Sequence, residues 1–239
     1  MAIIDVSGIN KSYAGRQALA DVSFTVDDGE IFGVMGPNGA GKTTLVEIIE
    51  GLRAPDAGSV RVLGMDPRSD RRRLNESLGV QLQNTQLPEN LKVWEGLSLY
   101  ASFYRAPANW EIVMEAWGLT SLRGKRIGKL SGGQRQRLFI ALALVGNPIL
   151  VILDELTTGL DPSARRETLS LVRRVRDGGV TVVLISHFMD EIEALCDRVV
   201  VLDEGRVVAI DTPVALAEQV GERTLDAAFE KLTRRVVEP

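Results

Sequence analysis

The segment that most restricts how this chain can fold is residues 36–44, which read GPNGAGKTT. It lies between an apolar run, EIFGVM, and the stretch TTLVEIIEGL, whose apolar spacing predicts a helix. Glycines at a strand-to-helix turn let the backbone curl until successive N–H groups face one anion, and the helix N-terminus adds positive potential there. The segment therefore predicts a phosphate-binding loop, with a glycine-rich turn that binds nothing as the alternative.

Polar side chains of the same loop indicate how a phosphate ligand would be held. Lys42 adds positive charge near the β- and γ-phosphates. The Thr43 hydroxyl is expected to reach Mg²⁺, and the Thr44 N–H a phosphate oxygen. The expected nucleotide-binding residues of this loop are Gly36, Pro37, Asn38, Gly39, Ala40, Gly41, Lys42, Thr43 and Thr44.

Strand-like and helix-like segments alternate along most of the chain. The strand-like segments are 22–26, 30–36, 59–64, 149–155, 180–187 and 198–205, and the helix-like segments are 41–52, 132–145, 162–177 and 189–195. The runs ILVIL and VTVVLI are apolar without alternation, which is typical of parallel strands covered on both faces. DDGE and DEGR are typical of turns in antiparallel hairpins. We predict a mixed α/β sheet that is parallel at its centre.

A helical insertion is predicted from about Asn84 to Lys129, where strand signals stop and aromatic residues recur at helical spacing. One face of this insertion is expected to form its own core. The residues on that face are Val93, Leu97, Tyr100 and Tyr104. The tail after Gly221 is expected to be a short helix with a charged end.

The bulk composition narrows the class of protein. A net charge of −4 gives no general basic field, so binding nucleic acid without sequence preference is not expected as the main role. The single cysteine, Cys196, is expected to pack in the core, and with no secretory signal at the start we expect a cytoplasmic protein. The longest apolar stretch is interrupted at residues 146–148 and is too short to span a bilayer.

Two carboxylates, Asp154 and Glu155, end the apolar run ILVIL. Charges at the end of a buried strand need a metal, a water or hydrogen-bond donors. Asp154 is expected to hold the Mg²⁺ shell, and Glu155 to act as the general base that polarises a water in line with the γ-phosphate. Two hydrated residues at a strand exit are the alternative.

The segment KLSGGQRQRLFIALAL offers a second anion site. Ser131, Gly132 and Gly133 stand at the start of an amphipathic helix whose first N–H groups are exposed. Taken alone, the segment favours an ordinary helix start with a serine cap.

The phosphate loop, LSGGQ, ILVILDE and SH follow one another here in an order and spacing that resemble the ATP-binding subunit of an ABC transporter. LSGGQ is highly specific to that family, and the resemblance covers nearly the whole chain. It implies an α/β P-loop NTPase fold with a mixed sheet, an antiparallel β subdomain and a helical insertion subdomain. The implied parts of this single domain, 1–239, are a catalytic core over 1–83 and 131–220, a helical subdomain over 84–130 and a C-terminal extension over 221–239.

The same resemblance implies further site residues. Tyr13 matches the aromatic residue that stacks on adenine, with strand packing as the alternative. Gln83 matches the glutamine that touches Mg²⁺ and senses the partner, although Gln81 competes for that alignment and a surface polar residue is the alternative. His187 is the only histidine, and it matches the residue that contacts the γ-phosphate, whereas a lone histidine is otherwise more often structural.

Contacts across a dimer are also implied. Asp161 in TTGLDP resembles the loop that communicates between two nucleotide sites, and Ser131, Gly132, Gly133 and Gln134 match the signature that faces the other copy's phosphate loop. Mg·ATP would lie between two head-to-tail copies, most simply a homodimer. Hydrolysis would drive a separate polytopic permease, leaving this subunit on the cytoplasmic face of the cell membrane only through that permease and soluble when isolated.

The direction of transport is suggested by the ending RTLDAAFEKLT, which resembles ATPases that serve drug, haem or polysaccharide exporters. Two other functions are weighed against this one. A soluble ABC ATPase would act in cluster assembly, repair or translation, and a regulatory module would bind nucleotide without turnover. The intact Glu155 and His187 disfavour the second of these.

Two further segments depart from the family pattern or stand outside it. The family usually has proline after the carboxylate pair, and this chain has Leu156, so the turn that carries Glu155 is expected to be looser. The run RSDRRRL, 68–74, is expected to be a solvated helix face, with a contact to acidic partner or lipid groups as the alternative.

Overall fold

The computed structural model describes residues 2–81 and 87–234. The chain divides into two compact units. The first unit combines Met1–Leu74 with Val183–Pro239, and the second unit is Asn75–Val182. These two units do not test the division that the family resemblance implies, which separates a catalytic core from a helical subdomain. That division stays a prediction.

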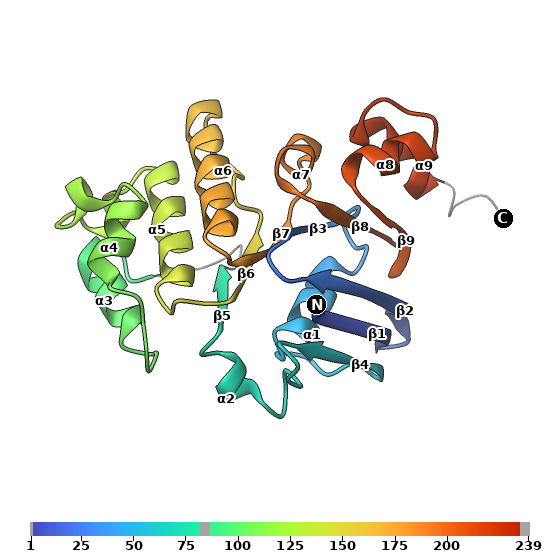
Figure 1. Cartoon of the computed structure of the whole chain (residues 1–239), viewed down its shortest axis with the longest axis horizontal. Coiled ribbons are helices and arrows are strands. Elements are labelled where there is room, and N and C mark those ends of the chain that lie inside the picture. Colours follow the sequence, from blue (N-terminus) through green and yellow to red (C-terminus); the bar gives the residue numbers. More distant parts are fainter. Residues whose placement is uncertain (1, 82–86, 235–239) are drawn as a thin grey trace. The chain divides into compact units, whose positions relative to one another are not determined.

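The first unit contains an antiparallel sheet in the order β2-β1-β4 (Figure 1). Its strands are β1 (Ala2–Tyr13), β2 (Arg16–Asp27) and β4 (Ala57–Val62). Burial alternates along the second half of β2, as expected when one face of a sheet covers a core. The predicted strands 22–26 and 59–64 are confirmed. β1 was not predicted, because polar residues interrupt its apolar pattern and its register with β2 shifts several times.

A second group of strands in the first unit pairs in both directions. β3 (Ile31–Met35) is parallel to β8 (Arg198–Asp203), and β8 is antiparallel to β9 (Arg206–Asp211). Every residue of β3 is buried. The DEGR hairpin is confirmed, but the DDGE hairpin is wrong, because β2 pairs with β1 whereas β3 pairs with β8. The turn at DDGE therefore carries the chain from one sheet to another.

The helices of the first unit are α1 (Lys42–Ile49), α2 (Arg71–Leu74), α7 (Met189–Leu195), α8 (Pro213–Gln219) and α9 (Leu225–Arg234). α9 is the predicted tail helix, and Figure 1 shows it beside α8. The arginines of α2 are exposed, as the solvated-face interpretation expects. Cys196 is buried, and this burial raises the pKa of its thiol, which confirms its core role.

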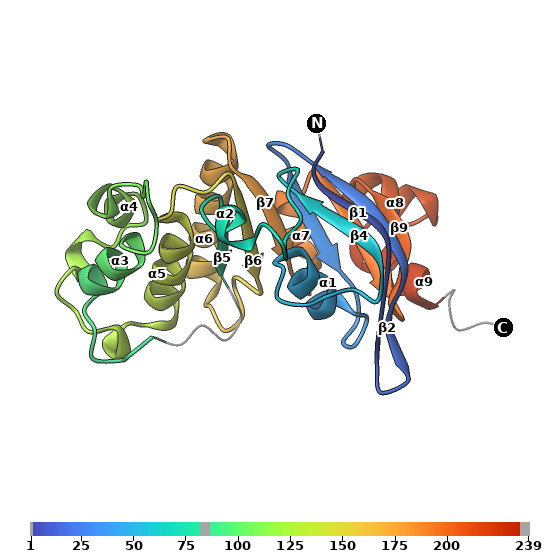
Figure 2. The same cartoon turned by 90° about the horizontal axis from the view of Figure 1, so that it is seen from below.

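In the second unit, β5 (Leu78–Gln81) lies parallel to β6 (Leu150–Asp154). Its helices are α3 (Val93–Ala101), α4 (Trp110–Ala116), the 3-10 turns η1 (Thr120–Leu122) and η2 (Ile127–Lys129), α5 (Gly132–Leu144) and α6 (Pro162–Asp177). Figure 2 shows α3 and α4 beside α5. β7 (Thr181–Ile185) is buried throughout and crosses the boundary between the units. The mixed α/β fold class is confirmed.

The predicted core face of the helical insertion is only partly right. Val93 and Leu97 are fully buried, whereas Tyr100 and Tyr104 are half-buried. Tyr104 lies beyond the end of α3, and its ring packs against Gly146, where an added Cβ would come within 2.5 Å. Among the described residues, no helix has both the length and the apolar character that crossing a bilayer takes.

Candidate functional site

The phosphate loop of the first unit is shaped by backbone that passes very close to two of its glycines. A Cβ atom at Gly36 would lie 2.3 Å from the Leu202 carbonyl oxygen, and one at Gly41 would lie 2.5 Å from that of Ala18. Real Cβ atoms do not approach backbone this closely, so only glycine fits at either position. Gly41 also has a φ of 102° where α1 begins. These contacts explain sterically why the motif has glycine at positions 36 and 41.

The turn between β8 and β9 supports the same loop. The Gly205 N–H donates to the Ala40 carbonyl oxygen at 3.1 Å, and the Ala20 N–H donates to the Gly205 carbonyl oxygen at 2.8 Å. Gly205 therefore connects the phosphate loop to β2. The sequence pattern predicted only a turn at DEGR. It missed this supporting role because the contact joins residues that are far apart in the chain.

Lys42 places its charge over the loop itself. Its Nζ donates to the carbonyl oxygens of Gly36 at 2.7 Å and Pro37 at 3.0 Å. Among the residues that the structure describes, no side chain caps the start of α1. The N-terminus of α1 and the lysine ammonium therefore combine positive potential at one place, as anion binding requires.

Tyr13 lies at the end of β1, where its side chain is 37% exposed. The Arg53 guanidinium carbon lies 5.1 Å from the ring centroid and the Lys11 Nζ lies 5.5 Å from it. Arg53 is held by Glu47 of α1, with 2.5 Å between Nε and Oε2. An exposed ring flanked by cations disfavours plain strand packing, and stacking on adenine stays a proposal. Sequence reasoning missed Arg53, whose position beside the ring depends on the fold.

His187 directly follows β7, and its side chain is exposed. Its ring centroid lies 4.1 Å from that of Phe188. A histidine that served only the core would be buried, so this exposure disfavours the structural alternative. Contact with a γ-phosphate stays a proposal.

In the second unit, Asp154 and Glu155 follow four fully buried residues of β6 and are themselves half-buried. Glu155 has a φ of 49°, a left-handed conformation that costs a non-glycine residue about 1–3 kcal/mol. Its Oε2 lies 3.5 Å from the Thr158 hydroxyl. The side chain of Leu156 is fully buried, so packing anchors the turn where the family has proline. Five other non-glycine residues among those described also have a positive φ, so this conformation alone does not assign a function to Glu155.

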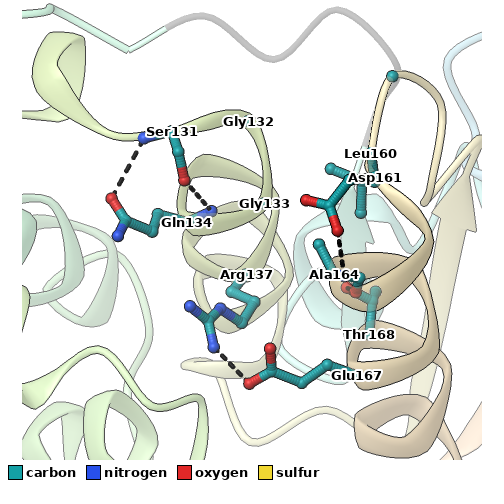
Figure 3. A pocket seen from close by; sticks show the side chains of 11 residues that line it. Ser131, Gly132, Gly133, Gln134, Arg137, Leu160, Asp161, Ala164, Glu167 and Thr168 are labelled. Atoms are coloured by element: carbon teal, nitrogen blue, oxygen red, sulfur yellow. Dashed lines mark hydrogen bonds and ion pairs between the residues drawn. The ribbon is translucent and has the colours of Figure 1, made fainter.

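The start of α5 has a reciprocal cap. The Ser131 Oγ accepts the Gln134 N–H at 3.3 Å, and the Gln134 Oε1 accepts the Ser131 N–H at 3.1 Å (Figure 3). Such a capping box fixes the first turn of a helix. Gly132 and Gly133 lie inside this first turn, so the serine-capped helix start is confirmed, and an anion site at the same helix start stays a proposal.

Asp161 lies across a cavity of about 300 Å³ from this helix start, and the same cavity is lined by Ser131 (Figure 3). The Asp161 Oδ1 accepts N–H groups from Ser163 at 2.9 Å and Ala164 at 3.0 Å, so the carboxylate caps α6. These two N–H donors lower the pKa of Asp161. The structure thus brings five predicted residues into one pocket, namely Ser131, Gly132, Gly133, Gln134 and Asp161.

An ion pair lies farther along the same pocket. The Arg137 Nη1 of α5 is 2.5 Å from the Glu167 Oε1 of α6, and Figure 3 shows the two side chains reaching toward each other. The pocket therefore has two helix starts at one side and a paired charge at the other. A small anionic group in this pocket would have to be held at the start of α5, because the Asp161 carboxylate already accepts the first N–H groups of α6.

The residues expected to hold Mg²⁺ are partly described. Thr43 presents an exposed hydroxyl in the first turn of α1, and Asp154 presents a half-buried carboxylate at the end of β6. Hydroxyl and carboxylate oxygens are the donors that Mg²⁺ prefers beside phosphates, so the chemistry of each residue fits the ion. That Thr43 of the first unit and Asp154 of the second share one ion stays a proposal. Gln83 lies outside the described residues, whereas Gln81 is buried at the end of β5.

A glycine loop between a buried strand and an uncapped helix, with a lysine over it, defines a P-loop nucleotide-binding protein of the α/β class. A family model described as ABC transporter matches residues 19–158. The chain belongs to the ABC transporter family.

Relatives and solved structures agree with this family. Nod factor export ATP-binding protein I of Rhizobium sp. (strain N33) is 40% identical over 222 residues, which is 90% of this chain and 73% of that protein. The protein of the same name from Burkholderia lata is 38% identical over 223 residues, with 91% and 73% covered.

Among solved structures, one described as the ATP binding subunit of an ABC transporter has a TM-score of 0.87 at 29% identity, covering 97% of this chain and 99% of the other. A dimeric ATP-binding cassette in a post-hydrolysis state, bound to ADP and Pi, has a TM-score of 0.78 at 25% identity, covering 87% and 98%. The chain is an ATP-binding subunit of the ABC transporter family and an ATPase.

Proposed function

We propose that this chain powers export: two copies bind Mg·ATP head to tail, and hydrolysis drives a separate membrane permease from the cytoplasmic face. The names of relatives that are about 40% identical support export, because they denote export ATP-binding proteins. A dimeric solved structure of similar fold supports the dimer. A soluble ATPase in assembly, repair or translation is the other candidate from the sequence, and the names of these relatives do not favour it.

One observation carries the proposed dimer. The capped start of α5 and the carboxylate of Asp161 line a cavity in the second unit, whereas the phosphate loop belongs to the first unit. The N-terminus of α5 beside this cavity suits the binding of a small anionic group. In the proposed dimer, that group is the γ-phosphate held by the phosphate loop of the other copy.

The roles of single residues follow from their chemistry. Glu155 accepts a proton from the attacking water, since a carboxylate held in a fixed direction can serve as a general base. Lys42 binds the β- and γ-phosphates, and His187 holds the γ-phosphate from the exposed turn after β7. Tyr13 stacks on adenine.

Mg²⁺, when bound, neutralises charge on the phosphates. Thr43 and Asp154 offer the oxygens that would hold it, and Gln83 is the third proposed ligand. Each of these residues contributes an oxygen of the kind that the ion prefers.

Mixed dimers test the head-to-tail arrangement. Ser131→Arg places a bulky cation in the signature pocket, and Lys42→Ala removes the phosphate-binding charge. Each variant alone is expected to be nearly inactive. A mixture should permit at most one intact site per heterodimer, the site that keeps both Lys42 and Ser131. Full ATP-dependent dimerisation of Ser131→Arg, measured by light scattering, would contradict the model.

The permease is proposed to dock at the segment that leads from Gln83 into the helical insertion. Within the described part of this segment, the Glu89 carbonyl oxygen accepts the Gly128 N–H at 3.0 Å and the Leu91 carbonyl oxygen accepts the Ile127 N–H at 2.8 Å. The backbone of 89–91 is therefore fixed, while the Glu89 side chain is exposed. A fixed backbone with exposed side chains suits a contact surface.

Charge reversal tests this surface. Glu89→Lys, or a bulky polar change at Leu87, is expected to leave ATP binding by the isolated subunit nearly intact while weakening copurification with the permease or its stimulation of hydrolysis. Transport that survives a disruptive multiple substitution across 86–92 would place the coupling surface elsewhere.

A further inference from the structure

The turn that carries His187 is fixed by a buried hydroxyl and a buried carboxylate. Ser186 is 1% exposed and Glu191 is 0% exposed, although His187 between them is exposed. The Ser186 Oγ donates to the Glu191 Oε2 at 2.7 Å and accepts the Phe188 N–H at 3.0 Å. The hydroxyl therefore joins the carboxylate to the backbone on both sides of His187.

The backbone closes the same loop from the other direction. The Glu191 N–H donates to the Phe188 carbonyl oxygen at 3.2 Å, and the Ile192 N–H donates to the same oxygen at 3.4 Å. Both polar groups of the Phe188 backbone are thus bound, one through Ser186 and one through the first turn of α7. Within this closed loop, His187 and Asp190 are the exposed residues.

A carboxylate as deeply buried as that of Glu191 is expensive, because burial removes the water that would solvate its charge. An apolar side chain would fill the same space at lower cost. The first turn of α7 compensates in part, since a negative charge is favourable near a helix N-terminus. The remaining cost indicates that the carboxylate has a role that an apolar side chain could not fill. Accepting the hydrogen bond of the Ser186 hydroxyl is such a role.

We propose that Glu191 is a positioning residue for ATP hydrolysis: through Ser186 it fixes the backbone that presents the His187 imidazole. This inference rests on the proposed role of His187 at the γ-phosphate. Glu191 itself touches no nucleotide. It acts by reducing the number of orientations that the imidazole can adopt, which matters because small misplacements of a reacting or binding group cost rate.

Variants at Ser186 distinguish the hydrogen bonds of the hydroxyl from the packing of the side chain. Ser186→Ala removes the hydroxyl, and Ser186→Thr keeps it. Ser186→Ala and Glu191→Gln are expected to lower kcat between about 10-fold and 100-fold while the ATP Kd changes less than about twofold. Ser186→Thr should retain most of the activity.

The matched control is Glu193→Gln, which removes a carboxylate from an exposed position of the same helix. This carboxylate accepts the Leu225 N–H at 2.7 Å, a bond that the amide oxygen of glutamine can also accept. Glu193→Gln should hydrolyse ATP at the normal rate. Its behaviour separates an effect of the Ser186–Glu191 pair from a general effect of charge on α7.

The composition of the chain supplies a direct reporter. Because His187 is the only histidine, the imidazole signals in an NMR spectrum belong to one residue. Ser186→Ala and Glu191→Gln are expected to shift or broaden these signals, and Glu193→Gln should leave them unchanged. A residue that only stabilised the core would lower the melting temperature without moving them.

A double variant completes the test. If Glu191 acts through His187, then Ser186→Ala combined with His187→Ala should hydrolyse ATP no more slowly than His187→Ala alone. Both changes remove the same contribution, that of a correctly oriented imidazole. Additive losses would overturn the inference. So would a normal kcat and an unchanged imidazole spectrum in both Ser186→Ala and Glu191→Gln, while a slow His187→Ala would leave the proposed function standing. Normal hydrolysis by His187→Ala would instead overturn the role of His187 and, with it, the task assigned to Glu191.

Discussion

Each of the two units of this molecule has a helix N-terminus at a proposed anion site, but the two helix starts are built from different parts of the chain. In the first unit, Gly41 precedes α1, whose start has no side-chain cap among the described residues, and the close approach of the Ala18 carbonyl oxygen excludes any residue but glycine at position 41. In the second unit, Ser131 precedes α5 and forms a reciprocal side-chain cap. One site is made by backbone, and the other by side chains.

Because the two sites are built differently, we expect substitutions to affect them in different ways. Where backbone makes the site, added atoms change the shape of the loop and act on folding as well as on binding. Where side chains make the site, as at Ser131, Asp161 and Glu155, a substitution can remove chemistry while the fold persists. The following predictions test this contrast, from the largest effect to the smallest.

The largest effect is expected in the second unit. Glu155→Gln should retain ATP binding but slow hydrolysis by about 10²–10⁴-fold, because a neutral amide cannot accept the proton of the attacking water. The same variant should accumulate as an ATP-bound dimer in size-exclusion chromatography. Near-normal turnover by the purified variant would remove Glu155 from the role of general base.

Lys42→Ala tests the charge in the first unit. ATP affinity should fall by about 10-fold to 100-fold, because hydrogen bonds to a charged group contribute roughly 1.5–3 kcal/mol. The lysine meets phosphate in the ground state as well as in the transition state, so the loss should show in binding itself. Titration calorimetry measures it, and an unchanged Kd would count against the assignment.

Variants at two glycines of the same loop separate the effect of a steric clash from the effect of a left-handed backbone. Gly41→Ala places a Cβ 2.5 Å from a carbonyl oxygen, whereas Gly39→Ala meets no atom within 4 Å although Gly39 has a φ of 84°. Gly39→Ala should cost about 1–2 kcal/mol of unfolding free energy from the left-handed backbone alone. Gly41→Ala should cost about 1–3 kcal/mol more from overpacking. Equal melting temperatures for the two variants would show that the close contact at Gly41 adds no destabilisation.

The smallest effect is expected from Ser131→Ala. Loss of a serine cap costs about 1 kcal/mol, so the variant should fold with a slightly lower melting temperature. Ser131→Gly keeps a residue that tolerates this position and serves as the matched control. A fall of the melting temperature as large as that of Gly41→Ala would contradict the contrast between the two units.

The sequence allowed the phosphate loop and the signature helix to be predicted because each is a continuous segment whose local pattern sets its structure. The strand, the loop and α1 lie next to one another in the chain, and Ser131 and Gln134 form their cap within four residues. The roles assigned to these residues remain proposals. The family and the fold class are confirmed.

Features that depend on distant contacts could not be predicted. A local turn pattern does not say which sheet the next strand joins, which is why the hairpin predicted at DDGE is wrong. Nor does it show that Gly205 supports the phosphate loop, that Arg53 lies beside Tyr13, or that Glu155 has a left-handed backbone. Gln83 lies outside the described residues, so its role stays a prediction.

The first unit is assembled from two separate pieces of chain, and this has a consequence for the order of events during synthesis. The phosphate loop leaves the ribosome before the second unit, whereas β8, which pairs with β3, and Gly205, which bonds to Ala40, follow only after the whole second unit. Contacts between such distant residues form slowly, because a long loop of chain must close first. A nascent chain that ends before residue 205 thus carries the nucleotide motif without the support that shapes it. The ability to hold ATP is therefore acquired only after the second unit and Gly205 have been made.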